Sequence, residues 1–368
     1  MAILAAWDAR FCPSPKRLRH NFRRHKNRDD FLQSTVRHSI NLLFTSVGRR
    51  VELLRAFKSA YQALELEGHI IGLDIDPIAP ALNVADCSYI VPRLSHPDYL
   101  KTLVQICQHE KVGLIFPLID PDIPFLAKHR EQLAGIGAQA VVVPAEAATI
   151  TTDKWQTGRF FRNLNLATPR SWLPEQAHAI EVDYPLFIKP RSGSASNHAY
   201  KVKNERELKF FLDYVPDPII QEYLTGAEIT NDVVCDLNGE IISVVSRRRL
   251  EVRWGEVAKG VTVYDPKVTE ACITIVQALH AIGPITVQCI LKDGIPYFTE
   301  INARVGGGAP LGIAAGADWP KWFLAKFAGI PLKIPPLGSY QHGLYLTRFD
   351  DSFFLSETHV EKMASRHL

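Results

Sequence analysis

The sequence has no long hydrophobic run. No apolar stretch reaches the roughly 18–20 residues that a helix needs to cross a bilayer, so we expect no transmembrane helix and no membrane partner. Residues 1–7 form a short apolar stretch that positive charges follow, whereas in a secretory signal the positive charges come first. A secretory signal is therefore not expected.

Cysteine is also scarce, with 6 in 368 residues, and no two cysteines have C-x-x-C spacing. Most of them lie in apolar stretches, where a free cysteine behaves as a small hydrophobe. The 13 histidines form no H-x-x-x-H pattern with a flanking carboxylate. These absences argue against a zinc centre and a disulfide framework, and they favour a reduced, cytoplasmic setting.

Two glycine-rich nucleotide motifs are missing as well. The turn after the first predicted strand has a single glycine, Gly48, where a dinucleotide site requires G-x-G-x-x-G, so NAD and FAD are disfavoured. The G-x-x-x-x-G-K-[ST] loop is absent too, which argues against a P-loop nucleotidase. Neither of these two phosphate-binding loops is therefore expected.

The residues that are present are typical of a globular protein, with 46% apolar and 22% charged, at a length that predicts two to three domains. Residues 1–40 carry 9 Lys or Arg against 3 Asp or Glu, and the remainder is slightly acidic, so nucleic acid is disfavoured as a partner of the body. We interpret 1–39 as a basic, disordered extension. The alternatives are residues upstream of the true start, or an arm that contacts RNA, DNA or an acidic surface.

Short apolar strands alternate with amphipathic helices over 40–148, which predicts a doubly wound α/β domain with a parallel sheet. Carboxylates at the ends of such strands suit an amine or a metal ion, but Asp-Pro pairs are also turn signals, and we favour turns. The aspartates at strand ends are Asp74, Asp76, Asp120 and Asp122. The strands are predicted over 41–46, 69–74, 85–91, 112–117 and 139–143, and the helices over 51–66 and 99–108.

From about residue 149 the pattern changes, and two lysines and a loop of small residues stand out. Lys154 begins a predicted helix, and Lys189 ends a predicted strand before the small-residue loop 191–197. Lysines neutralise a polyphosphate, and a loop rich in Gly and Ser brings N–H groups close to its oxygens. Further strands are predicted over 184–190, 199–202, 219–224, 228–236, 240–250, 286–291 and 296–301, and helices over 154–161, 205–214 and 267–281.

A strand that ends near residue 302 carries a candidate metal site. Alternation places Glu300 and Asn302 on one face, and both offer the oxygen ligands that Mg²⁺ prefers. Arg304 follows two residues later and, in extended geometry, points to the same side, where it can hold negative charge that develops in a transfer reaction. For the Glu-x-Asn triplet taken alone, an exposed strand edge is the alternative.

The stretch 246–260 is densely charged. Alternation predicts Arg247, Arg249 and Glu251 on one face and Arg248 on the other. Two arginines on one face can bind an anionic substrate, and a solvated strand and loop is the alternative.

Two further features stand near these groups. Lys259 precedes a glycine and is a candidate ligand of a γ-phosphate. The glycines 306–308 follow Arg304 and predict a flexible turn with room for the backbone of a substrate.

These features, in this order and at these separations, resemble the ATP-grasp superfamily. The motifs that carry the resemblance are Phe-Ile-Lys-Pro at 187–190, Leu-Thr-Gly-Ala-Glu at 224–228, and Gln288 followed by Glu-Ile-Asn-Ala-Arg at 300–304. The chain is similar to the large subunit of carbamoyl phosphate synthetase, with a single module. Biotin carboxylase and D-alanine–D-alanine ligase share that module.

The resemblance implies a domain organisation and a site. Residues 40–148 would form the α/β domain that precedes the module, 149–333 the two-lobed α+β module, and 334–368 a C-terminal segment. The phosphates of ATP would contact Lys154, Lys189, Ser192, Gly193 and Ser194, and its nucleoside Glu222, Tyr223, Leu224 and Glu228. Mg²⁺, or Mn²⁺, would bind Gln288, Glu300 and Asn302, where the family often has a further carboxylate in place of Gln288. Arg304 and Lys259 would act in catalysis, and Asp120, Arg247, Arg249 and Gly307 are substrate candidates.

The implied activity is ATP- and Mg²⁺-dependent joining of a carboxylate to an amine or another nucleophile through an acyl-phosphate, with release of ADP and phosphate. A single module argues against the synthesis of carbamoyl phosphate. We therefore expect a small-molecule carboxylate, an amino acid or a small acid, and an amine as partners, with the homodimer common in the family as a further expectation. The alternatives are a non-catalytic ATP-binding sensor or scaffold, and a small-molecule kinase on the same module.

Overall fold

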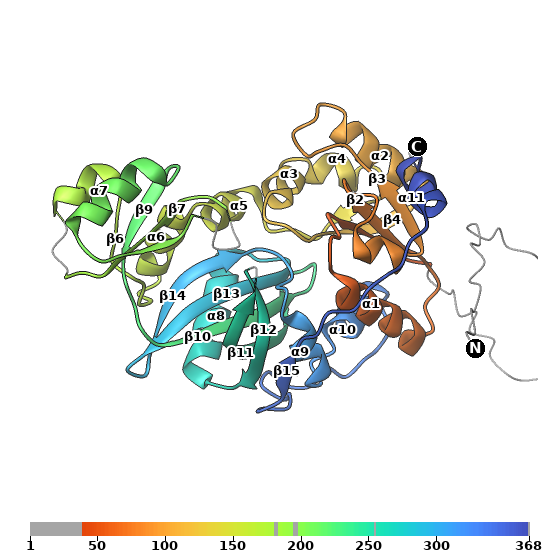
Figure 1. Cartoon of the computed structure of the whole chain (residues 1–368). Helices are drawn as coiled ribbons and strands as arrows, with labels where there is room; N and C mark the ends of the chain where they lie inside the picture. Colours follow the sequence, from red (N-terminus) through yellow and green to blue (C-terminus); the bar gives the residue numbers. More distant parts are fainter. Residues whose placement is uncertain (1–38, 180–182, 194–197, 254, 367–368) are drawn as a thin grey trace, which may run out of the picture.

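The computed structural model describes residues 39–179, 183–193, 198–253 and 255–366, which form three sheets. Figure 1 shows the parallel sheet near the C-terminus, a small sheet at the opposite end of the molecule, and a large antiparallel sheet below and between them. The extension expected over 1–39 lies outside the described residues except for Ser39, which pairs with Glu67 in an isolated bridge.

The first sheet has five strands in the order β3-β2-β1-β4-β5, and every neighbouring pair is parallel, so the predicted α/β fold class is confirmed. Its strands are apolar along their length because helices cover both faces. The strands are β1 (Asn41–Thr45), β2 (Ile70–Asp74), β3 (Cys87–Ile90), β4 (Val112–Pro117) and β5 (Gln139–Ala140). The helices are α1 (Val51–Leu64), η1 (Pro80–Asn83), α2 (Tyr99–His109), α3 (Asp122–Lys128) and α4 (Arg130–Ala134).

Helix α1 is fixed to this sheet by aromatic packing. The ring of Phe57 lies 5.0 Å from that of Phe44 and 5.3 Å from that of Phe116, measured between centroids. It also meets Trp319, at 5.4 Å, from a helix near the C-terminus. Each aromatic pair contributes about 0.5–1.5 kcal/mol beyond its buried area. This packing holds in place the start of α1, where Arg50 lies.

The small sheet has four antiparallel strands in the order β6-β9-β7-β8 and its own small core. Helix α7 (Glu205–Tyr214) packs on it and has a side-chain cap at its start, since Asn204 Oδ1 accepts the N–H of Glu207 at 2.9 Å. The strands are β6 (Ser171–Trp172), β7 (Leu186–Pro190), β8 (Tyr200–Val202) and β9 (Pro218–Glu222), with the short helix η2 (Pro174–Ala179) beside them.

The large sheet has six antiparallel strands in the order β14-β13-β10-β11-β12-β15. Apart from residue 254, which is not described, the charged stretch 246–260 belongs to a long hairpin in this sheet, in which Arg247 is buried whereas Arg248 and Leu250 are exposed. The strands are β10 (Ala227–Cys235), β11 (Ile241–Arg253), β12 (Glu256–Val263), β13 (Gly283–Lys292), β14 (Ile295–Asn302) and β15 (Tyr345–Thr347).

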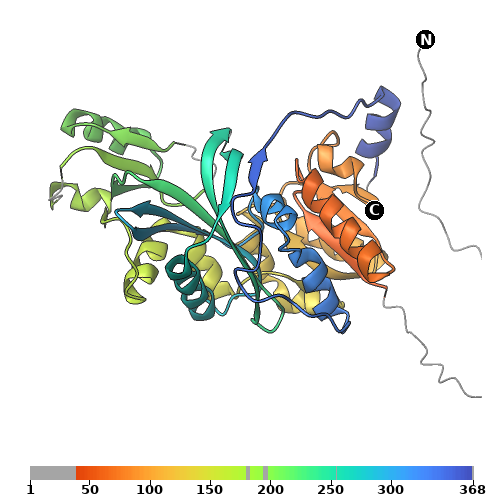
Figure 2. The same cartoon turned by 90° about the horizontal axis from the view of Figure 1, so that it is seen from below.

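The residues beyond 334 return to both large sheets. Strand β15 pairs with β12, and the last helix packs against β3 of the parallel sheet, as Figure 2 shows. The remaining helices of the described chain are α5 (Ala145–Thr152), α6 (Lys154–Asn163), α8 (Pro266–Ala278), α9 (Ala309–Ala314), α10 (Trp319–Phe327) and α11 (Glu357–Ala364).

One hydrophobic core joins the parallel sheet to the large antiparallel sheet. It runs from Leu43 and Ile71 through Phe161 to Val287 and Phe298, all of them nearly inaccessible to solvent. The division at residues 148 and 149 stays a prediction, since the chain packs as one core across it. Among the residues that the structure describes, no helix has the length and apolar character needed to span a membrane.

Asp122, at the start of α3, is buried with 1% exposure and accepts the hydroxyl of Thr45 at 2.6 Å. Burial, above all, raises the pKa of this carboxyl to about 6. The native protein therefore binds more protons than the unfolded chain between about pH 4 and 6, and stability is lost as pH rises through this window. The shift corresponds to a change of up to about 3 kcal/mol.

We expect Asp122→Asn to gain stability relative to wild type between pH 4 and pH 8, by up to about 3 kcal/mol, because the amide carries no charge to desolvate. Urea unfolding at both pH values measures the difference. Asp213→Asn, at an exposed position of α7, is the control. A stability difference for Asp122→Asn that does not change with pH would contradict the prediction.

Candidate active site

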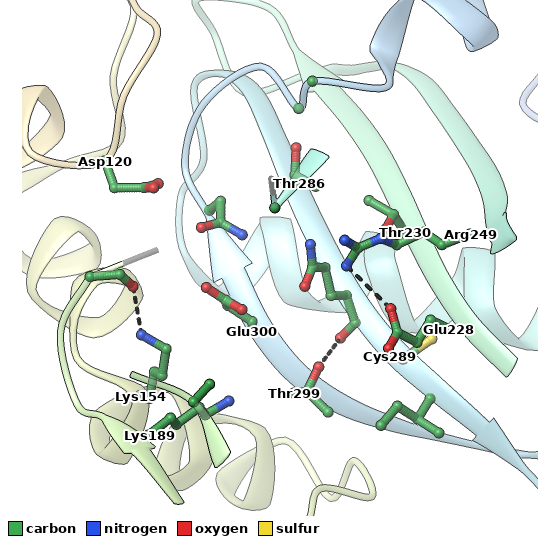
Figure 3. A pocket seen from close by; sticks show the side chains of 18 of the residues that line it. Asp120, Lys154, Lys189, Glu228, Thr230, Arg249, Thr286, Cys289, Thr299 and Glu300 are labelled. Carbon is green, nitrogen blue, oxygen red and sulfur yellow. Dashed lines mark hydrogen bonds and ion pairs between the residues drawn. The ribbon is translucent and has the colours of Figure 1, made fainter. Parts of the chain in front are cut away.

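A cavity of about 720 Å³ lies where the three sheets meet, and its walls come from distant parts of the sequence. Figure 3 shows lysines from the small-sheet side opposite the strands of the large sheet, with Asp120 reaching in from the parallel-sheet domain. Ser194 lies outside the described residues. The sequence-predicted residues that line the cavity are Asp120, Lys154, Lys189, Ser192, Gly193, Glu222, Tyr223, Leu224, Glu228, Arg247, Arg249, Gln288, Glu300, Asn302, Arg304 and Gly307.

Lys154 and the start of the small-residue loop are held together. Asp153 caps α6 by accepting the N–H of Trp155 at 2.8 Å, and the same carboxylate pairs with the guanidinium of Arg191 at 2.6 Å. Lys154 Nζ donates to the carbonyl of Gly193 at 2.7 Å. The helix start, the lysine and the loop therefore form one unit at one end of the cavity.

Lys189 lies on β7 and is 9% exposed. Burial is the main cause that lowers the pKa of its ammonium to about 8; the positive charge of Lys154 acts in the same direction, and the carboxylate of Glu300 opposes it. Figure 3 places both lysines across from Glu300. The negative charge nearby does not compensate the positive charges of the two lysines, so an anionic ligand would be favourable at this end of the cavity.

The candidate metal ligands lie on one face of two neighbouring strands. Gln288 on β13 is directly opposite Glu300 on β14, and Thr286 is opposite Asn302. Cross-strand partners share a face, as do residues two apart on a strand, so the three oxygen-bearing side chains gather on the cavity side.

This set of ligands fits a hard divalent cation. Mg²⁺ sites in proteins use one or two carboxylates and take their other ligands from substrate phosphates or water. Glu300 is the only carboxylate of this set, and the described residues contain no cluster of three or more His, Cys, Asp or Glu that would hold a metal alone. The ligand assignment stays a prediction.

Arg304 reaches across the cavity to the parallel-sheet domain. Its Nη2 donates to Asp120 Oδ2 at 2.7 Å, although the two residues are 184 positions apart. Its Nη1 donates to the carbonyl of Val305 at 3.3 Å. The ion pair joins the metal strand's end to the loop that follows β4.

Two of the other strand-end aspartates make the local hydrogen bonds that the turn interpretation predicts. Asp74 accepts the N–H groups of Gly48, at 2.7 Å, and of Asp76, at 3.0 Å. Asp76 in turn accepts the N–H of Ile78 at 3.0 Å. Of the four aspartates at strand ends, Asp120 alone is in the described lining of the cavity.

Family models match two adjoining parts of the chain. A model described as "PylC-like, N-terminal domain" matches residues 42–141, and one described as "ATP-grasp domain" matches 151–308. Residues 151–308 form an ATP-grasp domain. ATP and Mg²⁺, the cofactors expected from the sequence, are those of this family.

Solved structures of the ATP-grasp fold resemble the whole body. The biotin carboxylase domain of Hydrogenobacter thermophilus 2-oxoglutarate carboxylase, solved as a dimer with MgADP, matches with TM-score 0.65 and 17% identity over 84% of this chain and 74% of that chain. N5-carboxyaminoimidazole synthetase from Staphylococcus aureus matches with 0.66 and 17% over 82% and 80%. L-amino acid ligase from Bacillus licheniformis matches with 0.61 and 21% over 79% and 74%. At these identities the likeness establishes the fold.

Two predictions for the charged stretch need correction. Arg247 and Arg249 share the cavity face as predicted, but the β11–β12 register shifts between Arg249 and Glu251, which breaks the alternation and takes Glu251 out of the lining. Lys259, directly opposite Glu251, pairs with it at 2.6 Å. The lysine side chain is 56% exposed and does not line the cavity, so the structure does not support contact with a γ-phosphate.

The two arginines are also less available than expected, because each already has a carboxylate. Arg247 Nε lies 2.7 Å from Asp232 Oδ2, and both side chains are almost fully buried. Arg249 Nη1 lies 3.2 Å from Glu228 Oε2, so the predicted nucleoside ligand is held by this arginine. Both pairs stand along one wall of the ATP-grasp cavity.

The three glycines 306–308 serve close approach, not flexibility. A side chain at Gly308 would lie 2.4 Å from Arg247 Nη1, and one at Gly306 would lie 2.7 Å from Asp232 Oδ1. At Gly307 it would lie 2.7 Å from an arginine of the parallel-sheet domain. The space that the sequence assigned to a substrate backbone is therefore partly filled by the protein's own charged groups.

Sequence reasoning missed three residues at this end of the cavity. Arg50 and Glu256 line it, and Arg348 donates to the carbonyl of Gly307 at 2.6 Å. Arg50 lies in the turn after the first strand, close to Gly48, and Glu256 lies in the charged stretch 246–260. Both residues are therefore close to features that the sequence analysis described. Arg348 had no local signal, because only tertiary folding brings the C-terminal segment here.

We expect Gly308→Ala to lower the free energy of unfolding by about 1–3 kcal/mol, because the new methyl group displaces Arg247 from its buried partner Asp232. Chemical denaturation measures the loss. Gly113→Ala is the matched control, since its methyl group would meet no atom closer than 3.7 Å. Equal effects of the two substitutions would show that close packing is not the reason for the glycine.

Proposed function

We propose that the protein is an ATP- and Mg²⁺-dependent ligase that joins a carboxylate to an amine and releases ADP and phosphate. One observation carries this proposal: a single cavity brings together two lysines, a face of oxygen ligands and an arginine from separate parts of the chain. These are Lys154 and Lys189, the face around Glu300, and Arg304. The structures described above as a biotin carboxylase domain, a synthetase and an amino acid ligase support a C–N bond as the product.

The lysine end would bind the phosphates, together with the loop that begins at Ser192 and Gly193. Main-chain groups of 222–224 would contact adenine, and Glu228 would contact the ribose. Gln288, Glu300 and Asn302 would hold Mg²⁺, which supplies charge neutralisation to the triphosphate when bound. In this arrangement the γ-phosphate would lie near Arg304, between the nucleotide end and the substrate end of the cavity.

The reaction then needs two displacements. An oxygen of the substrate carboxylate attacks the γ-phosphorus, and the bond between this phosphorus and the β,γ-bridging oxygen breaks. ADP departs, and the substrate is then an acyl-phosphate. The amine nitrogen then attacks the acyl carbon, loses a proton, and phosphate departs with the C–O bond electrons. Arg304 would hold the phosphoryl group through both steps, since a buried guanidinium stabilises developing negative charge at low cost in reorganisation.

The two proposed substrates are a small carboxylic acid or amino acid, and an amine. A homodimer and a cytoplasmic setting remain predictions from the sequence. A sensor or scaffold without catalysis would be expected to lack part of the constellation, whereas Glu300, Asn302 and Arg304 all line the cavity. No observation favours a kinase over a ligase, and the first experiment below separates the two.

We expect ADP and phosphate to appear only when a suitable carboxylate and amine are both present with Mg²⁺-ATP. A phosphate-release screen over pairs of amino acids and hydroxy acids, with product analysis by mass spectrometry, tests this. Arg304→Ala should lower kcat at least about 100-fold, whereas Arg248→Ala, on the exposed face of β11, should not. AMP and pyrophosphate as products, or a phosphorylated acceptor without an amide, would exclude the ligase.

We expect the affinity for MgADP to fall as pH rises above 8, because the pKa of Lys189 is lowered to about 8 and binding must return the missing proton. The Kd should rise by up to about tenfold per pH unit from 8 to 9, measured by isothermal titration calorimetry. Lys189→Arg should flatten this dependence, since guanidinium stays charged. The same slope in both proteins would show that Lys189 does not cause it.

A further inference from the structure

The end of the cavity beyond Arg304 contains a guanidinium with spare hydrogen-bonding capacity. Arg50, the residue before α1, lines the cavity with a side chain that is 18% exposed. Its one ion-pair contact in the described chain joins Nη1 to Glu256 Oε1, at 2.9 Å. A guanidinium carries five N–H donors, so most of those on Arg50 remain for a ligand.

The carboxylate of Glu256 does not belong to Arg50 alone. Its other oxygen lies 3.1 Å from Arg348 Nη1 and 3.5 Å from Arg49 Nη2. Three guanidinium groups thus share the carboxylate of Glu256, and one of them, that of Arg348, also pairs with Glu52 at 3.0 Å. Burial lowers the pKa of Arg50, and the positive charges of Arg304 and Arg348 act in the same direction, against the carboxylates of Glu256 and Asp120. An additional anion at this position would be favourable.

The neighbouring pair, Arg304 and Asp120, does not share its carboxylate in this way. Arg50 is therefore the cation that is available to a ligand. Arg304 Nη2 has Asp120 to itself, at 2.7 Å, and our proposed reaction uses Arg304 for the phosphoryl group. Helix α1 begins directly after Arg50 and its first turn has no side-chain cap, so the positive end of its dipole adds to the same field.

The carboxylates in this end of the cavity restrict the kind of anion. Glu256 and Asp120 both line it, and they would repel a doubly charged phosphate but attract an ammonium. Cation and anion stand side by side here, in the pairs Arg50–Glu256 and Arg304–Asp120. A ligand with a carboxylate and an amine a few bonds apart matches both signs.

We propose that Arg50 binds a carboxylate of the amine substrate that does not react, so that the enzyme selects an amino acid as its amine and rejects a simple amine. This inference rests on the proposed ligase function, for which it names the second substrate. The planar fork of Arg50 can take both oxygens of a carboxylate in parallel hydrogen bonds. Arg50 is therefore a specificity-determining residue, and Arg304 is left to hold the phosphoryl group.

A purely structural role for Arg50 leads to a different expected result, and a comparison with Arg49 distinguishes this role from substrate binding. Both arginines contact Glu256, but the Arg49 side chain is 56% exposed and does not line the cavity. If Arg50 only neutralises Glu256, the two residues should behave alike on substitution. If it binds substrate, only Arg50 should affect the discrimination between a carboxylate and a neutral group.

The experiment measures binding without turnover, by isothermal titration calorimetry on the full chain saturated with MgADP. The probes are the common amino acids, each paired with its carboxamide, in which a neutral amide replaces the carboxylate. Wild type should bind at least one amino acid about tenfold or more tightly than its carboxamide. Arg50→Met should abolish this preference and leave the Kd of MgADP unchanged, whereas Arg49→Met should retain both.

Arg50→Lys keeps the charge without the fork and should retain part of the preference, which also provides a test if Arg50→Met does not fold. The inference is overturned if Arg50→Met or Arg50→Lys keeps the full preference, if Arg49→Met loses it equally, or if wild type binds no amino acid better than its carboxamide. Because no turnover is needed, the preference can persist in a protein that releases no ADP. In that case the ligase proposal fails, and Arg50 is shown to bind a carboxylate but not as part of an amine substrate.

Discussion

The hydrophobic core that runs from the parallel sheet into the large antiparallel sheet determines where the charged groups meet. Leu43 and Phe298 belong to the same buried cluster, although they lie in different sheets. Close-packed interiors resist small displacements, so this core fixes the distance between the two cavity walls. Ion pairs such as Arg304–Asp120 can then form between residues 184 positions apart without ordering long flexible segments.

The cavity that results is lined by paired charges, most of them partly or fully buried. Removing one member of a buried pair leaves the other uncompensated, which typically costs 3–5 kcal/mol, on the order of half of a domain's total stability. The pairs Arg247–Asp232 and Arg304–Asp120 are therefore parts of the fold as well as of the site. Among the described residues no ion pair joins Lys154 or Lys189 to a carboxylate, and Arg50 shares the carboxylate of Glu256 with other arginines. The two lysines stand at the end where we place the phosphates, and Arg50 stands at the end where we place the substrate carboxylate.

The glycines 306–308 illustrate how local chemistry and tertiary packing meet. Their sequence suggests flexibility, but the main chain is held against the side chains of Arg50, Asp232 and Arg247, and a methyl group at any of the three would approach one of them within 2.7 Å. Arg348, from the C-terminal segment, closes the same region by donating to Gly307. The substrate end of the cavity is thus built from the first helix, the β11–β12 hairpin and the last strand together.

The sequence by itself determined many of the elements and, within the cavity lining, the residues of its chemical motifs, but it did not predict the helices α9 and α10 that follow the glycines. Residue periodicity is local, so the parallel strands, the helix over 205–214 and the shared face of Glu300 and Asn302 could be predicted from it. Tertiary structure alone decided which charges meet: a register shift removed Glu251 and Lys259 from the cavity, and long-range folding brought Arg50, Glu256 and Arg348 together. Periodicity specifies a face but not the partner across it, because that partner depends on the packing of segments hundreds of residues apart.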